Sequence, residues 1–149
     1  MYRRILVALE HSGADATIVD HVRGLARCTG ASLILMHVAD GWAARNIKHL
    51  DLRESEEMKT DRAYLERLAA DLTRDGLKAD ALLATGDPAS EIVQAAEREH
   101  CDLIAMATHG HKLIGDVVYG SVANDVRHRT MVPVLLVRAP VGVHKQAAP

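Results

Sequence analysis

The sequence is poor in aromatic residues and in cysteine. Its 149 residues include no phenylalanine, one tryptophan and three tyrosines, so it lacks the aromatic surfaces on which RNA-binding domains stack bases. The two cysteines, Cys28 and Cys101, lie far apart and form no C-x-x-C pair. We therefore expect neither a disulfide framework nor a zinc site, and free thiols are typical of a cytoplasmic location.

The chain also lacks an excess of one charge and a long apolar run. The chain has 18 lysines and arginines and 20 aspartates and glutamates, which gives a formal net charge of −2. Nucleic-acid binders, in contrast, are usually basic. The apolar run near the N-terminus ends at Glu10 and His11. That run is too short for a signal peptide or for a membrane helix of about 20 residues. We expect neither nucleic acid nor a membrane as a partner.

Short apolar segments alternate with segments of helical periodicity. The segments that we interpret as strands are 5–9, 33–38, 79–84, 103–107 and 133–138, and those at 5–9 and 103–107 are expected to be buried. Helices are expected over 14–28, over about 55–75, from Pro88 onward and from Gly120 to Val126, whereas 39–53 is interpreted as an irregular connection. This alternation predicts one α/β domain over residues 1–140, with three α/β/α layers and a five-stranded parallel sheet. The tail 141–149 lacks periodicity and is expected to be disordered.

Three helix boundaries carry specific signals. Gly30 and Gly76 follow two of the expected helices and can end them, because glycine readily adopts the left-handed conformation. Asp87 precedes Pro88, which predicts an N-terminal cap followed by proline at the first helical position.

The strand ends that precede helices should lie at one edge of the sheet. Ligands bind at this edge in parallel sheets, so the turns 10–13, 38–41 and 107–110 are expected to form one crevice.

The stretch 102–126 has the pattern of a phosphate-binding turn. An apolar strand ends near Gly110, and nine residues later Gly120 and Ser121 open the next helix. Glycines allow backbone N–H groups to approach an anion, and the first N–H groups of a helix are unpaired and partly positive. The Ser121 hydroxyl could add a further donor. The alternative is an ordinary pair of turn glycines that binds nothing.

The motifs and their order resemble those of the universal stress protein family. The resemblance extends over about residues 3–139 and rests on ILVALEHS, LMHV, TGDPASEIV, MATHGHKLIGDVVYGSVANDV and PVLLV. The nucleotide-binding branch of that family carries G-x2-G-x9-G-[ST], which Gly110, Gly120 and Ser121 match, while Ala107 replaces the first glycine. Glu10 replaces the family's usual aspartate. An alanine keeps its backbone N–H available if φ is negative there.

The resemblance implies a Rossmann-like fold, similar to the adenine nucleotide α-hydrolases, that binds ATP with or without Mg²⁺ in a stress-response or signalling role. The implied contacts are with adenine and ribose for Ala8, Leu9, Glu10, Met106 and Ala107, with the adenine edge for the Val38 backbone, and with phosphate for Gly110, Gly120, Ser121 and Val122. The sequence leaves open whether the nucleotide is ATP, AMP or a cyclic dinucleotide.

Metal and enzyme alternatives have weaker support. Histidines lie near strand ends at positions 11, 37, 109 and 111, but the H-x-H pair has no carboxylate or thiol at a recognised spacing, so we expect no dedicated metal site. Lys112 fits a phosphate contact or solvent, and Asp116 fits magnesium support or a helix cap. The run 12–15 resembles the loop of ATP pyrophosphatases without its second glycine and final serine. A Walker motif and a Ser-His-Asp set are absent, so we expect no enzyme, or at most slow ATP hydrolysis.

The last expected strand predicts a dimer. Residues Val134 to Val137 would form an apolar edge that a second copy could cover by antiparallel pairing about a two-fold axis. This arrangement resembles the family's usual homodimer. The alternative function is therefore a stress-protein dimer that binds no ATP and acts as a protein-interaction adaptor.

Overall fold

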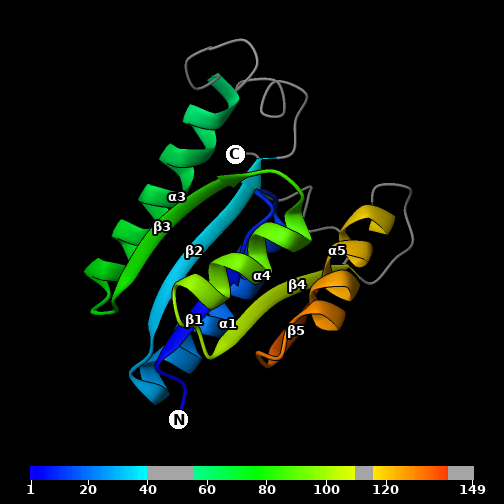
Figure 1. The fold of residues 1–149 in the computed structure, drawn as a ribbon. Coiled ribbons are helices and arrows are strands. Elements are labelled where there is room, and N and C mark those ends of the chain that lie inside the picture. The colour runs from blue at the N-terminus through cyan, green and yellow to red at the C-terminus, as the bar shows by residue number, and fades with distance from the viewer. Residues whose placement is uncertain (40–55, 110–115, 141–149) are drawn as a thin grey trace.

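The computed structural model describes residues 1–39, 56–109 and 116–140, with the backbone alone for 116–121. Its elements alternate between strand and helix along most of the chain (Figure 1). In order they are β1 (Arg4–Ala8), α1 (Ala14–Thr29), β2 (Ser32–Ala39), α3 (Glu56–Arg74), β3 (Ala79–Thr85), α4 (Pro88–Arg98), β4 (Leu103–His109), α5 (Asp116–Arg129) and β5 (Val134–Ala139).

The strands form one parallel sheet of five strands in the order β3-β2-β1-β4-β5. The expected α/β fold with a five-stranded parallel sheet is thereby confirmed. The order of the strands reverses between β1 and β4, since the chain adds β2 and β3 on one side of β1 and the later strands on the other. Such a reversal marks the place where doubly wound sheets bind ligands.

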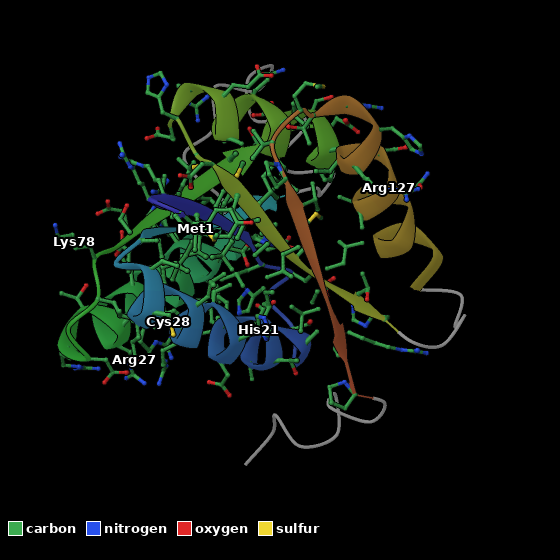
Figure 2. All side chains as sticks on the ribbon, turned by 90° about the horizontal axis from the view of Figure 1, so that it is seen from below. Met1, His21, Arg27, Cys28, Lys78 and Arg127 are labelled. Atoms are coloured by element: carbon green, nitrogen blue, oxygen red, sulfur yellow. The ribbon has the colours of Figure 1, made fainter. Side chains whose placement is uncertain are left out.

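The two faces of the sheet bury separate cores. Ile5 and Val7 of β1 face the core that α1 and α3 cover, while Leu6 and Ala8 face the core under α4 and α5. This alternation follows from the two-residue repeat of a strand. A view from below shows the side chains filling the space between sheet and helices (Figure 2). Each fully buried Ile or Leu contributes roughly 1.5–3 kcal/mol to folding.

The helix boundaries predicted from glycine, aspartate and proline in the sequence are confirmed. Gly30 follows α1 with φ 74° and donates its N–H to the Ala26 carbonyl at 2.8 Å. Gly76 follows α3 with φ 89°. Asp87 caps α4 by accepting the Ser90 N–H at 3.1 Å, with Pro88 as the first helical residue. These local signals therefore specify one end of each of three helices.

One helix boundary differs from its prediction. Helix α5 begins at Asp116, so Gly120 and Ser121 lie in its second turn and do not open it. The i, i+4, i+8 spacing of Val118, Val122 and Val126 already begins before the glycine, and a glycine inside a helix costs only about 1 kcal/mol. The unpaired N–H groups at the start of α5 therefore include those of residues 116–118.

Some sequence-based expectations fall outside the described residues. They concern the irregular connection over 40–53, the turn glycine Gly110 with its neighbours His111 and Lys112, and the tail 141–149. Within the described part, the helices include none that is long and apolar enough to cross a membrane.

Candidate functional site

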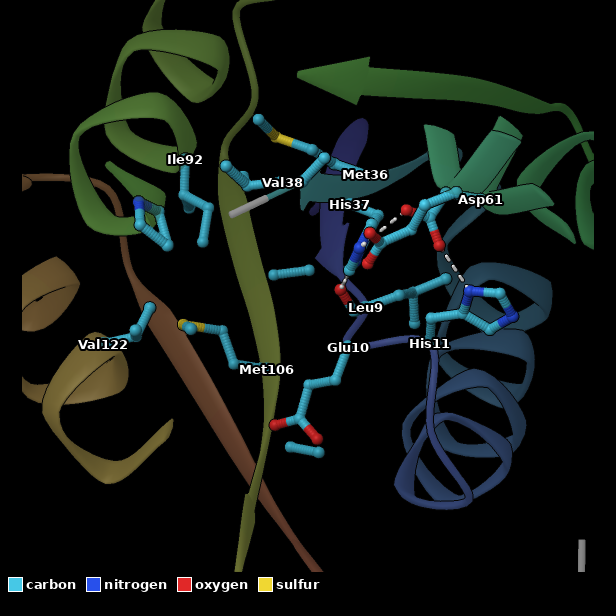
Figure 3. A pocket seen from close by; sticks show the side chains of 15 residues that line it. Leu9, Glu10, His11, Met36, His37, Val38, Asp61, Ile92, Met106 and Val122 are labelled. Atoms are coloured by element: carbon cyan, nitrogen blue, oxygen red, sulfur yellow. Dashed lines mark hydrogen bonds and ion pairs between the residues drawn. The ribbon is translucent and has the colours of Figure 1, made fainter. Parts of the chain in front are cut away.

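A pocket of about 370 Å³ opens at the carboxyl edge of the sheet (Figure 3). It lies where β1, β2 and β4 end, beside the reversal of strand order. The described lining residues are Ala8, Leu9, Glu10, His11, Met36, His37, Val38, Ala39, Glu57, Asp61, Pro88, Ile92, Met106, Ala107 and Val122. Residues of the three expected turns line this one pocket, namely Glu10 and His11, Val38 and Ala39, and Ala107, although the structure places the last three within the ends of β2 and β4. The expected crevice is thus present.

The pocket brings together most of the residues that the resemblance implied. Those that line it are Ala8, Leu9, Glu10, Val38, Met106, Ala107 and Val122. Gly110 lies outside the described residues, and Gly120 and Ser121 are described only as backbone of α5. The nucleotide contacts assigned to all these residues remain predictions.

The lining has an apolar side and a polar side. Met106, Ile92 and Val122 form much of the apolar side, and the polar side carries His37 and Asp61 (Figure 3). Among the described lining residues there is no lysine or arginine. The apolar side suits a flat heterocycle, while the polar side offers hydrogen-bond acceptors rather than positive charge.

Glu10 and His109 form a largely buried pair between the ends of β1 and β4. The Nε2 atom of His109 lies 2.8 Å from Oε2 and 3.0 Å from Oε1 of Glu10. Burial raises the pKa of the Glu10 carboxyl, although the contacts with His109 lower it in part. Ser12 Oγ also donates to Oε2 at 3.1 Å. Because each carboxylate oxygen accepts more than one hydrogen bond, Glu10 retains capacity for a ligand hydroxyl.

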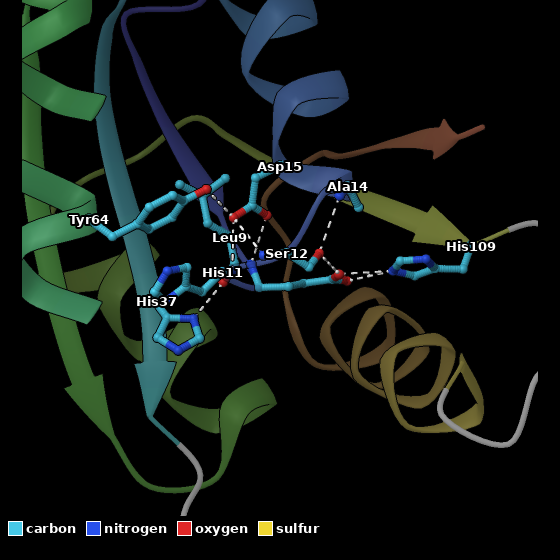
Figure 4. A network of polar contacts seen from close by, with 9 residues as sticks. Leu9, His11, Ser12, Ala14, Asp15, His37, Tyr64 and His109 are labelled. Carbon is cyan, nitrogen blue, oxygen red and sulfur yellow. Dashed lines mark hydrogen bonds and ion pairs between the residues drawn. The ribbon is translucent and has the colours of Figure 1, made fainter. Parts of the chain in front are cut away.

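Asp15 holds the turn after β1 in place. Its carboxylate accepts the backbone N–H groups of Glu10 and His11, each at 2.9 Å, and of Ser12 at 3.3 Å. It also accepts the Tyr64 hydroxyl at 2.7 Å (Figure 4). Asp15 is only 2% exposed, so these donors replace the water that a carboxylate needs. His11 adopts φ 60° in this turn.

Asp61 joins α3 to the ends of two strands. It is 6% exposed, and its Oδ1 lies 2.5 Å from Nδ1 of His11. Its Oδ2 lies 3.6 Å from Nε2 of His37, whose Nδ1 lies 2.9 Å from the Leu9 carbonyl oxygen. The His11 ring stacks on Tyr64, with 4.0 Å between the ring centroids. The start of α3 is thus fixed over the pocket by polar contacts.

Sequence analysis missed the roles of Asp15, Asp61 and Tyr64. Asp61 precedes Leu65 and Ala69 at i, i+4, i+8 on the buried face of α3. A charged residue on an apolar helix face is therefore the signal that would have pointed to it. The ring of Tyr64 packs beside the same core, but the partner of its hydroxyl depends on tertiary contacts.

The histidines considered as metal ligands have other partners. His11 and His37 contact Asp61, and His109 contacts Glu10. Within the described residues, no group of three or more His, Cys, Asp or Glu side chains has the geometry to hold a metal ion. His111 lies outside that part of the chain.

Comparison with known proteins agrees with this architecture. The sequence is 27% identical to the universal stress protein MJ0577 of Methanocaldococcus jannaschii, over 93% of this chain and 96% of that protein. It is 31% identical to a universal stress protein of Thermus aquaticus, over 93% of this chain and 100% of that protein. The solved structure of MJ0577 superimposes with a TM-score of 0.74 and covers 94% of this chain and 98% of its own.

Two further solved structures share the fold and contain nucleotides. A universal stress protein in complex with cAMP has a TM-score of 0.67 at 21% identity, covering 92% of this chain and 97% of its own. The Archaeoglobus fulgidus protein in complex with dAMP has a TM-score of 0.67 at 20% identity, covering 91% and 98%. The sequence model of the Universal stress protein family matches residues 1–138, and this chain therefore belongs to the universal stress protein family.

Proposed function

We propose that this protein binds an adenine nucleotide, ATP in the first instance, in the pocket at the carboxyl ends of β1, β2 and β4. The observation that carries the proposal is the pocket itself, which lies at the reversal of strand order and has one apolar side and one side rich in acceptors. Its volume of about 370 Å³ is in the range of small-molecule sites. Two fold neighbours hold cAMP and dAMP, which share an adenine and a phosphate.

The charge of the lining favours one orientation of the nucleotide. The carboxylates of Glu57 and Asp61 lie on the α3 side of the pocket, and they would repel phosphate. The base is therefore proposed to lie against the apolar side chains, and the phosphates to be held by Gly110, Gly120 and Ser121, with Mg²⁺ bound mainly through phosphate oxygens. The unpaired N–H groups of the first turn of α5 would add positive potential on this side.

The first test is to identify what the protein carries. Small molecules released by denaturing the purified protein would be identified by mass spectrometry, and calorimetry would measure affinity for ATP, AMP and a cyclic dinucleotide. We expect ATP at about one per subunit, or a measurable affinity for it. An empty protein that binds none of these nucleotides would contradict the proposal.

A pair of variants separates pocket binding from surface binding. Val122 lines the pocket, so Val122→Trp should fill it and abolish nucleotide binding. Asn124 lies on the exposed side of the same helix, so Asn124→Trp should bind as the wild type does. Equal affinity of the two variants would place the nucleotide elsewhere.

We further propose that the protein is a cytoplasmic homodimer that uses the nucleotide as a signal in the stress response, with at most slow ATP hydrolysis. The alternative is a dimeric adaptor without nucleotide. In both alternatives the dimer is inferred from β5, which is an edge strand of the sheet and leaves Leu136 43% exposed. An exposed apolar edge strand favours pairing with a second chain.

A further inference from the structure

The turn after β1 is held by a carboxylate that lies behind the pocket wall. Asp15 accepts three consecutive backbone N–H groups (Figure 4). Those of Glu10 and His11 lie at 2.9 Å, and that of Ser12 lies at 3.3 Å. Asp15 is 2% exposed and is not among the described residues that line the pocket. It therefore acts on the pocket only through the turn.

The hydrogen bonds to Asp15 hold the turn in a conformation that its sequence does not favour. His11 has φ 60°, a left-handed conformation that glycine adopts readily and that costs energy in a residue with a β-carbon. Successive N–H groups in such a turn form a concave site for an anion. The buried carboxylate of Asp15 fills this site, and its charge strengthens each hydrogen bond.

The turn directs two neighbouring side chains to opposite walls of the pocket. Glu10 reaches toward β4, where its Oε2 lies 2.8 Å from Nε2 of His109. His11 reaches toward α3, where its Nδ1 lies 2.5 Å from Oδ1 of Asp61. Glu10, His11 and Asp61 all line the pocket (Figure 3). The conformation of this one turn thus places a polar side chain on each wall.

We propose that Asp15 is a positioning residue for the ligand of this pocket, because it holds Glu10 and His11 in their binding geometry before the ligand arrives and does not contact the ligand itself. A turn that is already ordered loses less entropy on binding than a turn that the ligand must order. The affinity for the ligand should therefore depend on a carboxylate outside the pocket. The inference deepens the proposed function and rests on it, since the ligand whose affinity is measured is the nucleotide.

Asp15→Asn and Asp102→Asn form a matched pair of variants. Asp102 also accepts backbone N–H groups beside β1, those of Arg3 at 2.8 Å and Arg4 at 3.0 Å, but at the opposite end of the strand. Each amide keeps the size of the side chain and removes its charge.

Calorimetry with ATP and Mg²⁺, at a temperature at which both variants are folded, would compare their affinities with that of the wild type. We expect the affinity to fall at least about tenfold in Asp15→Asn, about the effect of losing one hydrogen bond to a charged group. We expect the wild-type affinity in Asp102→Asn.

His11→Gly tests whether Asp15 acts through the conformation of the turn. Glycine adopts a φ near 60° without the cost of a β-carbon, so the turn depends less on Asp15 in this background. The loss of affinity that Asp15→Asn causes should therefore be a smaller factor in His11→Gly than in the wild type. An equal factor in both backgrounds would overturn the inference.

Amide hydrogen exchange of the ligand-free wild type requires no variant and applies even if Asp15→Asn fails to fold. We expect the amides of Glu10, His11 and Ser12 to exchange slowly, because a buried carboxylate accepts them. Rapid exchange of these amides, wild-type affinity in Asp15→Asn, or an equal loss of affinity in Asp102→Asn would overturn the inference and leave the proposed function intact. A wild type that binds no adenine nucleotide would overturn both.

Discussion

The Tyr64 hydroxyl donates to Oδ2 of Asp15 at 2.7 Å and so links α3 to the turn after β1. Burial raises the pKa of the Tyr64 phenol, and the hydrogen bond to Asp15 raises it further. Removing the hydroxyl would leave one lone pair of a buried carboxylate without its donor. A substitution that removes only this oxygen atom therefore measures how much the hydrogen bond contributes to the free energy of unfolding.

We predict that Tyr64→Phe lowers the free energy of unfolding by about 1–3 kcal/mol, the usual effect of losing a hydrogen bond to a charged group. Urea denaturation would measure the change. Tyr2→Phe is the control, because Tyr2 packs beside the same core and its hydroxyl has no hydrogen bond within the described residues. If the two variants lose equal stability, the contact with Asp15 is not the cause.

The stability of the protein should depend on the protonation of Glu10. Burial raises the pKa of this carboxyl in the folded protein above its usual 4.5, so the folded state holds the proton more tightly than the unfolded state. The contribution of Glu10 to stability therefore falls as the pH rises above 4.5 through the folded pKa. We predict that the free energy of unfolding of the wild type, relative to Glu10→Gln, decreases over this window.

Chemical denaturation of the wild type and Glu10→Gln at a series of pH values would measure that difference. Glu66→Gln is the control for loss of a carboxylate, because Glu66 lies on the exposed face of α3. A difference between the wild type and Glu10→Gln that stays constant, or that increases with pH, would contradict the prediction.

The two cysteines should differ in reactivity. Cys28 is exposed and Cys101 is buried, and burial raises the pKa of the Cys101 thiol to about 11. Since the thiolate is the reactive form, a disulfide reagent should label one thiol of the native protein rapidly at about pH 8 and the second only after unfolding in guanidinium. Native Cys28→Ser should remain unlabelled, and rapid labelling of this variant would show that Cys101 is accessible.

The edge strand β5 should determine the oligomeric state. Leu136 is exposed on this strand, so Leu136→Lys should place charges in the proposed dimer interface and yield monomers, as light scattering would detect. Met131→Lys is the control, because Met131 is 99% exposed and precedes the strand. A dimer that persists in Leu136→Lys would move the interface to another surface.

The sequence predicted the fold well because its evidence is local. Five apolar runs of strand length specify the five strands, and Gly30, Asp87 and Pro88 specify helix boundaries through their own backbone preferences. The predicted start of α5 is wrong because Gly120 lies inside the helix and does not mark its boundary. The valine periodicity on both sides of it outweighs the cost of one glycine.

The alternation of strands and helices, and the edge at which a ligand would bind, can thus be predicted from local patterns in the amino-acid sequence. Which polar side chains meet at that edge depends on tertiary packing. Asp61 is separated by 50 positions from His11 and contacts it because α3 packs on β2, the neighbour of β1. Glu10 meets His109 across 99 positions because β1 and β4 are neighbours. Periodicity reports which face of an element is buried, whereas contacts between distant residues arise from the packing of whole elements.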